Sequence, residues 1–132
     1  MLKTDFVEVC QAVINGTLDE IKLEFDSMAS VCKYVVPEGY PINSVKNQFI
    51  EFNASEQAKH FFGAIDEKNG NYLMTGSRAI AFVGHGITLE QAEQKAQKAV
   101  ESVKGKVFFR KDIGTKALIE KRVNRMKELL NK

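Results

Sequence analysis

Residues 79–103 read AIAFVGHGITLEQAEQKAQKAVESV and contain the two elements that decide the fold. The run over residues 79–84 is small and apolar, as expected of a buried strand. Thr88 and Gln91 form a capping box, in which the threonine oxygen accepts a hydrogen bond from the third backbone N–H of a new helix. This pattern predicts a helix over residues 88–104, ended by Gly105. Its buried face is narrow, so we expect the helix to pack closely on a sheet; the face consists of Leu89, Ala92, Ala96, Ala99, Val100 and Val103.

Short segments on both sides of this stretch supply the other strands. Alternation of apolar and charged residues predicts a half-buried strand over residues 21–25. A β-branched and aromatic run predicts a second strand, which Pro37 closes. Asn69-Gly70 is typical of a hairpin turn. The strand that Pro37 closes covers residues 30–36, and the remaining predicted strands are residues 48–52, 60–66, 72–75 and 107–109.

Two further helices are predicted at the ends of the chain. Residues 2–14 carry an apolar stripe at spacings of three and four, capped by Thr4 or Asp5, and a last helix starts near Thr115. The order of elements predicts an α+β fold, with a small, mostly antiparallel sheet or partial barrel and two packed helices. The change of period near residue 18 predicts a detached N-terminal helix over residues 1–18, and a main domain over residues 19–132.

The composition is that of a globular protein of one domain, or one domain with an appendage. The chain has 132 residues, of which 44% are hydrophobic and 27% are charged. No apolar run approaches the length of about 20 residues that spans a bilayer, and the acidic start does not resemble a secretory signal. The two cysteines, Cys10 and Cys32, exclude a disulfide scaffold and predict two buried thiols in a reducing cytoplasm.

The net charge of +2 hides an asymmetry along the chain. Residues 1–103 hold 9 Lys and Arg against 14 Asp and Glu, a balance of −5, whereas residues 104–132 hold 10 against 3, a balance of +7. The basic end is compatible with binding phosphate on a nucleotide or nucleic acid. It is equally compatible with the solvated face of a helix. No aromatic stacking motif accompanies the cations, which disfavours nucleic acid.

No self-sufficient catalytic constellation is present in the sequence. His60 and His85 have no metal-ligand spacing, so no metal site is predicted. Gly84-His85-Gly86 before a capped helix is only a weak anion-binding signal, and no Gly-rich phosphate loop occurs. We therefore assign no catalytic residue to this chain.

Two segments are less generic. Arg78 follows Gly76 and Ser77 at the start of an apolar strand, where an arginine delivers a fork of donors to phosphate or carboxylate. Arg110, Lys111 and Asp112 lie between an aromatic strand and a helix start. Each segment is interpreted either as an anion site or as a local salt bridge, and the sequence leaves both interpretations open.

These segments carry a resemblance to a known family. The chain resembles the C-terminal region of the phosphoribosylamine–glycine ligases, also called glycinamide ribonucleotide synthetases, of the ATP-grasp superfamily, and is more like the archaeal members. Gly-Ser-Arg stands where the family pattern has Gly-Gly-Arg, and Ile-Asn-Ser-Val follows the Gly-Tyr-Pro motif. The matching segments, which cover nearly the whole chain in the family order, are residues 2–8, 29–41, 76–80, 88–92 and 109–114.

The resemblance implies a ligase of purine biosynthesis that joins phosphoribosylamine to glycine with ATP and Mg²⁺ (or Mn²⁺). Its ATP and metal elements would precede these residues, so the chain itself would bind no cofactor and would be inactive alone. Residues 1–18 would be the last helix of the ATP-grasp domain, and residues 19–132 the C-terminal domain. The implied partners are the rest of the ligase and a small phosphorylated substrate, without nucleic acid or membrane, with self-association through the first helix as a further option.

The resemblance also implies which residues contact the substrate. The expected substrate-binding residues are Arg78, Ser77, Gly76, Arg110, Lys111, Asp112, Gly39, Tyr40 and Pro41. Arg78 is the first choice for a cation that faces a phosphate, and the Gly39-Tyr40-Pro41 loop is expected to form a wall of the cleft. The alternative function is a stand-alone, non-catalytic module that binds a small phosphorylated ligand. Binding of glycinamide ribonucleotide without any other protein would favour this module.

Overall fold

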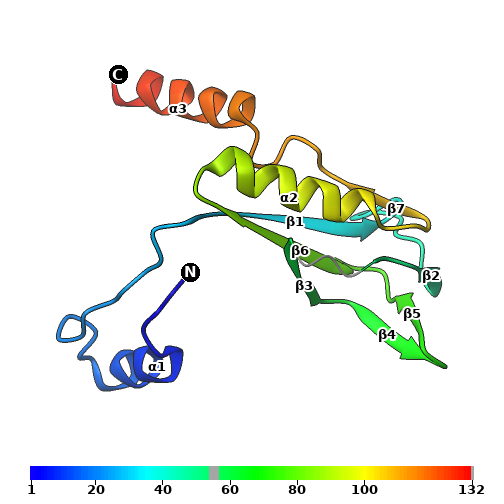
Figure 1. Cartoon of the computed structure of the whole chain (residues 1–132), viewed down its shortest axis with the longest axis horizontal. Helices are drawn as coiled ribbons and strands as arrows, with labels where there is room; N and C mark the ends of the chain where they lie inside the picture. Colours follow the sequence, from blue (N-terminus) through cyan, green and yellow to red (C-terminus); the bar gives the residue numbers. More distant parts are fainter. Residues whose placement is uncertain (54–56, 132) are drawn as a thin grey trace.

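The structure, a computed structural model, describes residues 1–53 and 57–131. Its helices and strands are arranged as an α+β fold, which confirms the predicted class (Figure 1). The elements are α1 (Phe6–Asn15), β1 (Ala29–Pro37), β2 (Gln48–Ile50), β3 (Ala58–Phe62), β4 (Ile65–Lys68), β5 (Asn71–Met74), β6 (Ile80–Gly86), α2 (Leu89–Glu101), β7 (Val107–Phe109) and α3 (Lys116–Leu130).

The larger sheet has four antiparallel strands in the order β3-β6-β1-β7. Helix α2 lies along β1 and β6 and covers one face of this sheet (Figure 1). The helix approaches closely because β6 ends in glycines. A Cβ on Gly84 would overlap the carbonyl oxygen of Ala92 and would lie 2.8 Å from the backbone nitrogen of Ala96. The alanine-rich face predicted for this helix is therefore matched by glycine on the strand beneath it.

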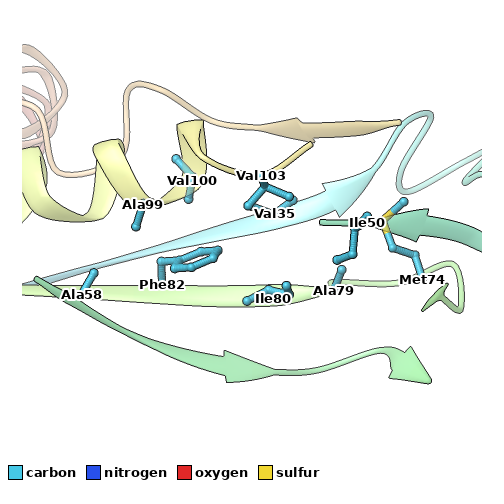
Figure 2. Packing of buried hydrophobic residues seen from close by; sticks show 10 residues of the cluster. All are labelled: Val35, Ile50, Ala58, Met74, Ala79, Ile80, Phe82, Ala99, Val100 and Val103. Carbon is cyan, nitrogen blue, oxygen red and sulfur yellow. The ribbon is translucent and has the colours of Figure 1, made fainter. Parts of the chain in front are cut away.

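The hydrophobic core lies between α2 and the sheet (Figure 2). Phe82 and Ile80 of β6 and Val35 of β1 are fully buried, together with Val100 of α2. Alternation along β1 decides which side chains enter the core, since successive residues of a strand point to opposite faces. Val31, Lys33 and Val35 face α2, whereas Cys32, Tyr34 and Val36 face the other way and line one pocket.

The smaller sheet has three strands in the order β2-β5-β4, with Met74 and Ile50 joining the core. The predicted hairpin is present, because β4 pairs with β5 around Asn69 and Gly70, both of which have positive φ. The single strand predicted over residues 60–66 is wrong in one respect. The strand is interrupted at Gly63. Before it, β3 pairs with β6 in the larger sheet, and after it, β4 pairs with β5 in the smaller sheet. The two sheets do not close into the partial barrel considered above.

The two ends of the chain depart most from the expectations. Residues 21–25 form no strand, because only one isolated bridge, between Leu2 and Phe25, is made there. Asp5 caps α1 by accepting hydrogen bonds from the backbone of Val7 and Glu8, as expected. Figure 1 shows α1 lying away from both sheets. No residue of α3 is buried in the described part of the chain, so this helix is not packed as the sequence suggested.

Candidate functional site

A pocket of about 280 Å³ lies on the face of the larger sheet opposite α2. We call this face the open face, since Tyr34, Phe61 and Phe108 on it are 42–56% exposed. The pocket brings together three of the predicted site residues from three separate segments: Tyr40, Arg78 and Arg110. The other lining residues are Cys32, Tyr34, Val36, Phe108, Phe109 and Ile113.

Arg78 is held over an aromatic ring. Its guanidinium carbon lies 5.3 Å from the ring centroid of Tyr34, which is a cation–π distance. No ion pair to Arg78 is found among residues 1–53 and 57–131. The salt-bridge interpretation of Arg78 therefore has no support among these residues. A guanidinium that stacks on a ring and lacks a carboxylate keeps its donors for an anion.

Tyr40 reaches the pocket from the loop after β1. The backbone N–H of Tyr40 donates to the carbonyl of Pro37, and the N–H of Asn43 donates to the carbonyl of Gly39 at 2.8 Å. Gly39 has a φ of 80°, and any Cβ there would overlap the carbonyl oxygen of Asn43. The Tyr40-Pro41 peptide bond is cis. Glycine and the two local hydrogen bonds therefore give the loop the defined shape that the sequence predicted.

Arg110 belongs to the turn between β7 and α3, and a carboxylate already neutralises it. Its Nε and Nη2 donate to the two carboxylate oxygens of Asp112 at 3.0 and 2.6 Å. Both side chains are about half exposed. The local ion-pair interpretation of this segment is thus confirmed. Because Arg110 is paired and Arg78 has no ion pair in the described part of the chain, Arg78 is the better cation for a ligand.

The Arg110–Asp112 pair predicts a pH dependence. The hydrogen bond from Arg110 lowers the pKa of the Asp112 carboxyl below its ordinary value. The contribution of the pair to stability is therefore present above the ordinary carboxyl pKa and is lost as the pH falls through the lowered value. In Arg110→Ala, we expect the Asp112 carboxyl to titrate at higher pH, as measured by carbon NMR between about pH 2 and 6. An unchanged midpoint in this variant would show that the pair does not form in solution.

The remaining predicted site residues lie outside the pocket. Gly76 has a φ of 108° and lies against the side chain of Lys46, and Ser77 is exposed. Lys111 presents its backbone carbonyl to a lysine of β1, while Asp112 acts on Arg110. Gly39 shapes the loop of Tyr40, and Pro41 is exposed. These residues support the segments that carry Tyr40, Arg78 and Arg110, and none of them lines the pocket.

Three residues that shape the pocket or its surroundings were not predicted to belong to the site. Tyr34 supports Arg78, Phe108 forms a wall of the pocket, and Lys33 is buried on the opposite face of the sheet. Alternation along residues 31–35 is the signal that would have found Tyr34 and Lys33, because it places them on opposite faces of one strand.

Other features of the surface fit an anion less well. A pocket of about 500 Å³ between α2 and the start of α3 is lined by Glu90, Glu93 and Glu120, which repel an anion. The cysteines are both exposed, so the prediction of buried thiols is wrong. Partial burial nevertheless raises the pKa of the Cys32 thiol, which disfavours a thiolate nucleophile. In the described residues, no helix is long and apolar enough to cross a membrane, and no three potential metal ligands cluster.

The fold and the pocket define the class of protein. It is an α+β domain whose larger sheet is covered by a helix on one face and carries an arginine- and aromatic-lined pocket on the other. Residues 30–116 match the family described as phosphoribosylglycinamide synthetase, C domain, and the chain belongs to this family. The match leaves out α1 and nearly all of α3.

Relatives with known names agree with the family. The chain is 51% identical over 134 residues to phosphoribosylamine–glycine ligase of Methanococcus vannielii, and this match covers 98% of the chain and 30% of the relative. The identity to the ligase of Methanocaldococcus jannaschii is 46%, again over 98% of the chain and 30% of the relative. A crystal structure of phosphoribosylamine–glycine ligase from Thermotoga maritima matches 80% of the chain and 27% of that protein, with a TM-score of 0.64 and 26% identity. The chain thus spans about 30% of the length of these relatives.

Proposed function

We propose that this chain works as the C-terminal portion of a phosphoribosylamine–glycine ligase and contributes one wall of its substrate site. The main support for this proposal is the pocket in which Arg78, Tyr40 and Arg110 converge from three separate segments. Names of relatives that share the domain support the same proposal. In this function the chain serves cytoplasmic purine biosynthesis, within an enzyme of the ATP-grasp superfamily.

Arg78 is the residue that we assign to the phosphate of the substrate. A ligase that forms an acyl phosphate needs cations to balance the charge of phosphate groups while the amine attacks. Arg78 is exposed and lacks a carboxylate partner in the described chain, so binding a phosphate removes no existing ion pair. Tyr40 and Phe108 supply apolar walls for a sugar.

ATP and Mg²⁺ belong to the proposed reaction, and we assign their site to the preceding part of the ligase. Mg²⁺ is held by carboxylates together with substrate phosphates, and the described residues offer no cluster of three potential ligands. We therefore derive no step through the metal or the nucleotide from this chain. Its own contribution is to bind and orient the phosphorylated substrate.

Helix α1 is proposed to pack on the preceding part of the ligase, as the last helix of the ATP-grasp region. Phe6, Val7, Val13 and Ile14 are 58–82% exposed and form an apolar surface that both sheets leave uncovered. The helix also lies outside the matched residues 30–116. A surface of this kind is typical of a contact with another domain.

Calorimetric titration with glycinamide ribonucleotide tests the proposal. The chain is measured alone and with the preceding two thirds of the Methanococcus vannielii ligase. Binding only in the presence of that fragment supports a shared site, and heat of association between the two proteins supports the contact through α1. Binding by the chain alone supports the stand-alone module instead. Absence of binding in both mixtures would overturn both functions.

Arg78→Ala is expected to weaken binding of glycinamide ribonucleotide by about 10- to 100-fold, because a charge-assisted guanidinium–phosphate contact is lost. The affinity of Arg78→Lys should lie between those of Arg78→Ala and the unmodified chain, because lysine keeps the charge and loses the planar fork. Lys68→Ala is the matched control, as it removes a cation from the exposed end of β4, outside the pocket. Equal affinities of Arg78→Ala and the unmodified chain would contradict the assignment.

A further inference from the structure

Lys33 is almost completely buried, with 1% of its surface exposed. Its ammonium group donates to Oε1 of Glu93 and Oε1 of Gln97, both at 2.6 Å, and to the backbone carbonyl of Lys111 at 2.9 Å. A lysine ammonium has three N–H donors, so these three partners use its full capacity. Two of the partners lie on α2, and the third lies in the turn that carries Arg110.

Both ends of this turn are fixed to β1. The carbonyl of Lys111, next to Arg110, accepts the hydrogen bond from Lys33. At the other end, Gly114 packs so closely on Val31 that a Cβ on the glycine would lie 2.8 Å from Val31 Cγ1. The position of the Arg110 backbone is therefore set by β1 through a buried charge and a close contact.

The same strand also supports the second arginine of the pocket. Tyr34 directly follows Lys33, points to the open face and lies beneath the guanidinium of Arg78. Two consecutive residues of β1 thus contact the two arginine-bearing segments from opposite faces of the sheet. A shift of either contact changes the separation of Arg78 and Arg110.

We propose that Lys33 is a positioning residue that, with Tyr34, sets the spacing of Arg110 and Arg78 for a phosphorylated ligand. This inference rests on the proposed function of the pocket. Lys33 itself does not touch the ligand, because it lies on the α2 side of the sheet. Its effect on binding passes through the carbonyl of Lys111 to Arg110.

A double-mutant cycle tests this coupling. Lys33→Met is expected to weaken binding of glycinamide ribonucleotide about tenfold, under whichever titration condition the unmodified chain binds. In an Arg110→Ala background, Lys33→Met should have no further effect, since the residue that it positions is absent. In parallel, the side-chain Nε–H resonance of Arg110 should shift in Lys33→Met. A purely structural role would leave the effects of Lys33→Met and Arg110→Ala on affinity additive.

The controls separate positioning from loss of stability. Met74→Ala leaves a cavity in the core at β5 of the smaller sheet, away from the turn and from the partners of Lys33, and should leave affinity unchanged at a temperature where the variant is folded. If Lys33→Met does not fold, Lys33→Met/Glu93→Leu replaces the buried pair with apolar groups and still lacks the bond to Lys111. Additive affinities, or an unmoved Arg110 Nε–H resonance, would overturn the positioning role. Equal affinities of the unmodified chain and both arginine variants would overturn the proposed function, and the resonance alone would then decide the role of Lys33.

Discussion

Glu93→Ala is expected to lower the free energy of unfolding by about 3–5 kcal/mol, because it leaves the buried ammonium of Lys33 without its counter-charge. Glu93 Oε1 lies 2.6 Å from Lys33 Nζ, and Lys33 is 1% exposed. After the change, the partners that remain in the described structure are the neutral oxygens of Gln97 and of the Lys111 backbone. Denaturant unfolding followed by circular dichroism measures the loss directly.

The reverse truncation is expected to have a smaller effect. Lys33→Met replaces the charge with an apolar side chain of similar length, and the carboxylate of Glu93, which is 15% exposed, retains access to water. Lys33→Met/Glu93→Ala should then resemble Lys33→Met alone, since the buried charge is already gone. A loss in Glu93→Ala no larger than that in Lys33→Met would show that the pair is not desolvated.

The larger sheet and its helix were predictable because local signals and packing agree there. The capping box at Thr88 forms as predicted, with Thr88 Oγ1 accepting from the N–H of Gln91 and the side chain of Gln91 accepting from Ile87. The alanine face of α2 meets the glycines of β6. The strand prediction failed where an alternating segment lacks a second strand to pair with in the described structure. Residues 21–25 alternate as a strand does, but among residues 1–53 and 57–131 only Leu2 pairs with them, so no ladder forms there.

The candidate site was predictable by segment and less so by residue. Arg78, Tyr40 and Arg110 were identified as residues of unusual segments, and the sheet brings them to one pocket. Sequence alone could not show that Asp112 neutralises Arg110 and that Tyr34 supports Arg78, because both facts depend on side-chain direction. Lys33 was missed because a lysine in a strand is normally solvated, and only tertiary packing supplies its three acceptors.

Gly84→Ala is expected to lower the free energy of unfolding by about 3 kcal/mol, the upper end of the range for overpacking. In an open strand the same change would be stabilising, since alanine restricts the unfolded chain more than glycine does. Here the new Cβ overlaps the carbonyl oxygen of Ala92, so α2 must move away from β6. Thermal unfolding measures the loss. His85→Ala is the matched control. The side chain of His85, the next residue along β6, points to the opposite face of the sheet, and the backbone carbonyl of residue 85 still accepts a hydrogen bond from Lys95 in this variant. Stabilisation by Gly84→Ala would show that α2 does not lie on the sheet as closely as the structure has it.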